Sequence, residues 1–163
     1  NAVRGTRHGT AQLWTLTAAS TCSSNFRLLC LEPGVGDEVP FAWGAGSKFR
    51  HGPLDHEFVP GPHPIARNFR HVHFQDESYW NGIGDPARIN LLATGIAENE
   101  PRPLFWTTEP NGGRVFVSIL GHYNWTFDDP LFRLLILRGL CWSGGQPMDR
   151  LAGLATIGAR VGE

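Results

Sequence analysis

The spacing of apolar and polar residues is most regular between residues 101 and 145, where it first predicts a pair of strands. Residues 102–108 are aromatic with a β-branched end, and residues 114–120 form a run of Val, Phe, Ile and Leu that is typical of a buried strand. The segment 109–113 between them reads Glu-Pro-Asn-Gly-Gly, and its glycines can adopt positive φ. We therefore predict that the two strands pair as an antiparallel hairpin.

A helix is predicted next, from Pro130 to the glycines at 144 and 145. Asp128 or Asp129 can cap its N-terminus, and its leucine-rich sequence is apolar on most sides, so the helix should be largely buried. The loop before it carries His122 directly after a glycine. A strand that leads into a helix through a polar loop places that loop at the carboxyl edge of an open α/β sheet, where ligands usually bind. His122 is thus a candidate functional residue, although a surface loop histidine would give the same pattern.

The segment from residue 54 to residue 94 predicts three further strands. Residues 54–59 read as a strand that is broken by Pro60-Gly61-Pro62, after which His63 is expected to cap a turn. Residues 71–75 alternate between polar and apolar side chains with a period of two, as in a half-buried strand, and residues 88–94 form another strand.

The strand at 71–75 is followed by Asp76-Glu77-Ser78-Tyr79-Trp80, a mixture of carboxylates and aromatic rings. Such mixtures suit a sugar, because rings stack on its apolar face while carboxylates bind its hydroxyls. Glu77 is our preferred general base, with Asp76 as the alternative. Two solvated turn carboxylates, or a helix cap, would give the same sequence.

Composition narrows the functional classes. The 163 residues and formal charge of -1 indicate a soluble globular chain of about one domain, without the basic excess that nucleic-acid binding requires. No apolar run approaches the ~20 residues that span a bilayer. Three cysteines cannot all pair, and Cys141 within the predicted helix is expected to pack, which favours a reducing, cytoplasmic location. We expect the ligand to be a small-molecule carbohydrate. A homo-oligomer is the assembly that we consider for the chain.

Seven histidines raise the hypothesis of a metal site. Zinc requires three or four converging ligands. His71 and His73 lie on one face of a predicted strand and can supply two, with His51, His122 or Glu77 completing the set. Hydrogen bonding along a solvated strand face explains the same histidines, so a divalent metal such as zinc stays one option and the cofactor stays unknown.

Several short motifs, in a fixed order, resemble the ThuA-like (trehalose utilisation) family. They cover roughly residues 41–145 and comprise His63-Pro64-Ile65, Asp76-Glu77-Ser78-Tyr79, Pro103-Leu104-Phe105-Trp106-Thr107-Thr108, Gly112-Gly113-Arg114-Val115-Phe116, Leu120-Gly121-His122, Asp129-Pro130-Leu131-Phe132-Arg133 and Leu137-Arg138-Gly139-Leu140-Cys141-Trp142. Each motif alone is weak, whereas the ordered set is fairly specific.

The resemblance implies a flavodoxin-like, class I glutamine amidotransferase-like α/β fold. We therefore expect an open, mostly parallel sheet with an antiparallel hairpin near residues 102–120. Residues 1–145 would form one domain and residues 146–163 a C-terminal tail. Only one candidate strand, residues 10–18, precedes the long loop, so the front βα units of the family are expected to be absent or replaced.

The resemblance also implies carbohydrate catabolism, through keto-disaccharide or related intermediates, by isomerisation, epimerisation or hydrolysis. Removing a proton next to a carbonyl requires a base and a donor for the developing oxyanion. We expect Glu77 or Asp76 as the base and His122 as the acid or oxyanion donor. The side chains expected to bind substrate are His51, Tyr79, Trp106 and Asn124. For Trp106 and Trp125 a core or interface role is the default, with stacking of one of them on a sugar as the alternative.

Two other functions compete with this interpretation. A non-catalytic carbohydrate-binding or scaffold domain would fit an incomplete fold. A Cys-dependent hydrolase, with Cys22 as nucleophile and His122 as its base, would fit the amidotransferase-like architecture. The sequence around Cys22 lacks the glycines that permit a sharp nucleophile elbow, which disfavours the second alternative.

Overall fold

The computed structural model describes residues 41–42, 48–109 and 114–158. The predicted strand at 10–18, the front βα units and Cys22 lie outside these residues. The regular elements are β1 (Phe41–Ala42), β2 (Lys48–Pro60), η1 (Pro64–Ala66), β3 (Val72–Trp80), β4 (Ile83–Gly84), η2 (Pro86–Arg88), β5 (Asn90–Ala97), β6 (Glu100–Thr108), β7 (Val115–Ser118), η4 (Asn124–Asp128), α1 (Pro130–Ser143) and η5 (Ala152–Leu154), where η denotes a short 3-10 helix.

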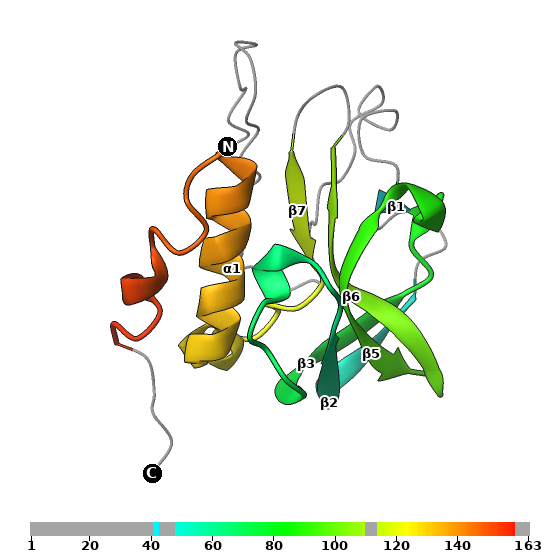
Figure 1. The fold of residues 1–163 in the computed structure, drawn as a ribbon. Coiled ribbons are helices and arrows are strands. Elements are labelled where there is room, and N and C mark those ends of the chain that lie inside the picture. Colours follow the sequence, from blue (N-terminus) through cyan, green and yellow to red (C-terminus); the bar gives the residue numbers. More distant parts are fainter. Residues whose placement is uncertain (1–40, 43–47, 110–113, 159–163) are drawn as a thin grey trace, which may run out of the picture.

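Five strands form one curled sheet in the order β3-β2-β5-β6-β7 (Figure 1). The short strands β1 and β4 pair separately. The helix α1 lies beside the β7 edge of the sheet, and the segment that contains η5 lies on the far side of α1. Within the described residues, every pair of neighbouring strands is antiparallel.

The hairpin and the helix predicted from the sequence are confirmed. β6 pairs with β7 in the register Phe105↔Ser118 to Thr108↔Val115. α1 begins at Pro130, and the Oδ1 atom of its N-cap, Asp129, accepts hydrogen bonds from the first free amides of the helix. Cys141 is buried in this helix and is not in a disulfide, as expected.

The expectation of a mostly parallel, flavodoxin-like sheet is wrong for these residues. Parallel neighbours need a crossover of a dozen or more residues, usually a helix. Here β5 and β6 are joined by the two residues Glu98 and Asn99, both with positive φ, and the one α-helix of the described residues follows the last strand. The loop at His122 therefore does not lie at the carboxyl edge of a parallel sheet, and the topological argument that selected this histidine does not apply.

The core lies between the sheet and α1 and is rich in aromatic side chains. Phe132 of α1 contacts the rings of Phe74 on β3 and Phe105 on β6. The buried apolar residues of this cluster are Phe58, Ile65, Ala66, Phe74, Leu92, Ala93, Leu104, Phe105, Trp106, Val115, Val117, Ile119, Leu120, Phe132 and Leu135. Packing of these residues fixes the position of β3 against the β7–α1 connection, where the candidate site forms.

Among the described residues, no helix combines the length and the apolar composition needed to cross a membrane. The division into a domain ending at residue 145 and a C-terminal tail stays a prediction.

Candidate functional site

The side chain of Asp76 connects β3 to the turn that follows β7. It is fully buried, and its carboxylate accepts hydrogen bonds from three backbone amides. Oδ1 accepts from Glu77 at 2.8 Å and from His122 at 3.1 Å, and Oδ2 accepts from Gly121 at 2.5 Å. Amide donors compensate the cost of burying a carboxylate. Asp76 is therefore held by backbone amides on both sides and fixes the position of His122.

Glu77, Tyr79 and His122 form a second group next to Asp76. The Tyr79 hydroxyl donates a hydrogen bond to Oε2 of Glu77. The same Oε2 lies 3.4 Å from Nδ1 of His122, and the Tyr79 oxygen is also 3.4 Å from that nitrogen. Glu77 is 2% exposed, whereas the side chain of His122 is 30% exposed. His122 is thus the member of the group that extends from a buried carboxylate towards the surface.

These contacts indicate the directions of the hydrogen bonds within the group. Burial, followed by the hydrogen bond to Glu77, raises the pKa of the Tyr79 hydroxyl above its ordinary value, so Tyr79 remains a donor. Because the Tyr79 hydroxyl directs its hydrogen at Glu77, the two oxygens near Nδ1 of His122 can only accept. The hydrogen of a neutral His122 is therefore assigned to Nδ1. The lone pair of a neutral His122 is then on Nε2, where it can accept a proton from a ligand.

Local backbone geometry explains why these residues meet. Glu77 and Tyr79 lie two residues apart on β3 and therefore on the same face, while Asp76 lies on the other. The partner strand β2 has an irregularity opposite Glu77, between Arg50 and Leu54. Gly121 has φ of 124°, a conformation that glycine adopts without strain and that turns the chain so that both amides reach Asp76.

The other residues predicted to bind substrate are not part of this group. His51 is on β2, within the irregular segment, and its side chain lies outside the described residues. Trp106 is in the core, 2% exposed, and Asn124 is exposed at the start of η4. His63 caps η1, as expected, because its Nδ1 accepts a hydrogen bond from the amide of Ile65 at 3.3 Å. Burial lowers the pKa of His63 and keeps that nitrogen an acceptor.

The two histidines considered as metal ligands each face a carboxylate of β2. Nδ1 of His71 is 2.6 Å from Glu57, and Nδ1 of His73 is 2.8 Å from Asp55. The predicted alternative, hydrogen bonding on an exposed strand face, describes these contacts. In the described part of the chain, no group of three or more His, Cys, Asp or Glu side chains is placed to hold a metal ion.

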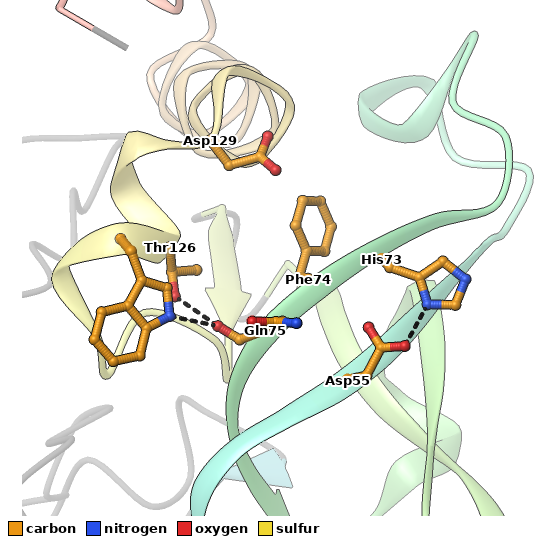
Figure 2. A pocket seen from close by; sticks show the side chains of 7 residues that line it. Asp55, His73, Phe74, Gln75, Thr126 and Asp129 are labelled. Carbon is orange, nitrogen blue, oxygen red and sulfur yellow. Dashed lines mark hydrogen bonds and ion pairs between the residues drawn. The ribbon is translucent and has the colours of Figure 1, made fainter. Parts of the chain in front are cut away.

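A pocket of about 290 Å³ lies between the β2–β3 hairpin and the η4–α1 segment (Figure 2). Its walls come from β2, β3 and η4 and from the N-cap of α1, so no local sequence pattern predicts it. The lining residues are Asp55, His73, Phe74, Gln75, Trp125, Thr126 and Asp129. Of these, Trp125 had been considered as a sugar-stacking residue, and a tryptophan in a polar loop was the one local signal available.

Comparison with known families gives one match. The model of the family ThuA, described as trehalose utilisation, matches residues 19–143, about three quarters of the chain. The chain therefore belongs to this family, which confirms the resemblance seen in its motifs and indicates a role in the utilisation of trehalose or related sugars. No curated protein and no solved structure matches the chain.

Proposed function

We propose that this protein is an enzyme that removes a proton from a carbon next to the carbonyl group of a keto sugar. His122 accepts the proton at Nε2, and the electron pair of the broken C–H bond forms an enolate with the carbonyl oxygen. If the proton returns to the opposite face of the same carbon, the product is an epimer. If it returns to a different carbon, the product is an isomer. Loss of a neighbouring glycosidic oxygen instead would start hydrolysis.

The observation that carries this proposal is the placement of a partly exposed histidine over a buried carboxylate. When His122 takes up a proton at Nε2, the negative charge of Glu77, 3.4 Å from Nδ1, stabilises the imidazolium. Tyr79 holds Oε2 of Glu77 in place, and Asp76 holds the backbone of His122. From the sequence we had expected Glu77 to be the base; the contacts favour His122 in that role, with Glu77 orienting and stabilising it.

The contribution of family membership to the proposal is the substrate class, a sugar of the trehalose type. Keto derivatives are the appropriate substrates because only a carbonyl makes the adjacent proton acidic enough for a histidine. The small carbohydrate is thus the ligand we propose for this site.

The test measures proton abstraction directly. The chain is incubated with keto derivatives of trehalose in D₂O, and incorporation of deuterium next to the carbonyl is followed by NMR, together with any product. General bases contribute roughly 10²–10⁴-fold to rate, so His122→Ala should lose about that factor and Glu77→Gln should also lose most activity. The matched controls are the single variants His71→Ala and Glu57→Gln. These two residues form a second histidine–carboxylate pair that lies outside the site.

The proposal fails if the wild-type chain incorporates no deuterium, or if it does so at the same rate in the two site variants. Sugar binding that persists without any exchange would instead support a non-catalytic carbohydrate-binding domain.

A further inference from the structure

The pocket of Figure 2 combines a rigid aromatic surface with several polar groups. Trp125 is 47% exposed although its ring is fixed on two sides. Its indole N–H donates to the backbone oxygen of Gln75 at 3.1 Å, and its ring stacks on Tyr123, with ring centres 4.2 Å apart and planes inclined by 10°. An exposed indole held in one orientation is a ready surface for the apolar face of a sugar ring, because no side-chain entropy is lost when the ring binds.

The polar groups of the pocket retain hydrogen-bonding capacity. Asp129 uses Oδ1 to cap α1, and in the described part of the chain its Oδ2 takes part in no hydrogen bond. Asp55 binds His73 through Oδ2, which leaves Oδ1 for another donor. Gln75 accepts hydrogen bonds from Trp125 and Thr126 with its main-chain oxygen. Its exposed side-chain amide takes no part in those two bonds. Carboxylate and amide groups of this kind bind sugar hydroxyls.

The pocket also lies next to the Glu77–His122 group. Gln75 and Glu77 are on the same face of β3, two residues and therefore about 7 Å apart along the strand. On the other side, Tyr123 contacts both the imidazole of His122 and the ring of Trp125, with ring centres 4.7 and 4.2 Å apart. The volume of about 290 Å³ is at the lower end of ligand pockets and is suited to one ring rather than to an oligosaccharide.

We propose that this pocket is a subsite for one pyranose ring, stacked on Trp125 and bound through its hydroxyls by Asp55, Gln75 and Asp129. The substrate of the neighbouring Glu77–His122 group is then a disaccharide, with one ring at each place; this second statement rests on the function proposed above. The binding of a single unreactive ring to the pocket does not depend on that function.

The experiment measures binding of methyl α-D-glucopyranoside and of trehalose to the full chain by calorimetry and tryptophan fluorescence. Trp125→Ala should weaken binding by roughly two- to twelvefold, since an aromatic contact contributes beyond the apolar area that it buries. Gln75→Ala should weaken it as well, and Asp129→Asn should do so while the cap is kept, because Asn caps helices as Asp does. Trp80→Phe, a tryptophan change outside this pocket, serves as the control.

The outcomes separate the two proposals. Weaker binding of methyl α-D-glucopyranoside by the pocket variants, with normal binding by Trp80→Phe, supports the subsite whatever the exchange experiment shows. If sugar binding is lost in Glu77→Gln and His122→Ala but unchanged in Trp125→Ala and Gln75→Ala, the subsite is overturned while the proposed function stands. Absence of any binding by the wild-type chain also overturns the subsite, and deuterium exchange then decides on the function independently.

Discussion

At the scale of single residues, burial and strand direction separate side chains that the sequence presents as equivalent. Asp76 and Glu77 are neighbours of the same chemical type, and both are buried. Because successive residues of a strand face opposite sides, Asp76 meets the amides of Gly121 and His122, whereas Glu77 meets the Tyr79 hydroxyl and the imidazole. One carboxylate therefore positions the backbone, and the other is available to stabilise charge on His122.

His56 offers a stability prediction at this scale. Its side chain is 1% exposed, and its Nε2–H donates to the main-chain oxygen of Asp76 at 3.2 Å. Burial lowers the pKa of His56 below 6.5. Above pH 6.5 the histidine is neutral in the folded and unfolded chain; below it, the unfolded chain binds a proton that the folded chain does not. The free energy of unfolding should therefore decrease as the pH falls from 6.5 to the lower folded pKa, by at most ~1.4 kcal/mol per pH unit for one group.

Denaturant titrations between pH 5 and pH 8, a window chosen around the ordinary histidine pKa of about 6.5, measure this slope. His56→Gln keeps an N–H donor for Asp76 and should flatten the curve. Burial also lowers the pKa of His63, so this histidine contributes to the slope in the same direction. An identical slope in wild type and His56→Gln would contradict the prediction.

At the scale of elements, close approach of α1 to β7 depends on one glycine. A β-carbon at Gly139 would lie 2.4 Å from Cδ1 of Phe116, whose ring stacks on Phe105. Gly139→Ala should destabilise the fold by roughly 1–3 kcal/mol, since a well-packed site must shift to accept the methyl group, and this outweighs the gain in helix propensity of up to about 1 kcal/mol.

Chemical denaturation checks this prediction against Gly153→Ala. Apart from its chain neighbours, no heavy atom of the described residues lies within 4 Å of a β-carbon at Gly153, so that change should be close to neutral. Equal effects of the two substitutions would mean that the contact between Gly139 and Phe116 does not limit the packing.

The elements also show what the sequence could predict. The β6–β7 hairpin and the Asp129 cap were predictable because their signals are local: a glycine turn, and an acidic residue before a proline. The antiparallel sheet was not, since the pairing of β2 with both β3 and β5 depends on contacts distant in sequence. Likewise, the sequence placed Glu77 and His122 in one candidate site, and the structure brings their side chains together. The argument from a parallel sheet was wrong, and the pocket was not predicted because its walls come from several elements.

At the scale of the whole molecule, Arg138 joins three parts of the chain around α1. This arginine is 6% exposed, and its guanidinium donates to the main-chain oxygens of Ile65 and Arg67, at 3.2 and 2.9 Å. Its Nε donates to Oδ1 of Asp149 at 2.7 Å, and Arg67 forms an ion pair with the same carboxylate. Asp149 thus links the segment after α1 to the helix and to the η1 turn.

This link predicts an acid-dependent loss of stability. The hydrogen bond from Arg138, and then the one from Arg67, lowers the pKa of Asp149 below 3.8. A carboxylate with a depressed folded pKa stabilises the native state fully above its unfolded pKa and loses that contribution as the pH falls through the folded value. The difference in free energy of unfolding between wild type and Asp149→Asn should therefore be constant near neutral pH and shrink below about pH 4. Urea titrations across this range measure it, with Asp85→Asn, an exposed cap of η2 that Asn can replace, as control. A difference that persists unchanged in acid would mean that the Asp149 charge does not hold the three parts together, and that Arg138 is retained by its two main-chain acceptors alone.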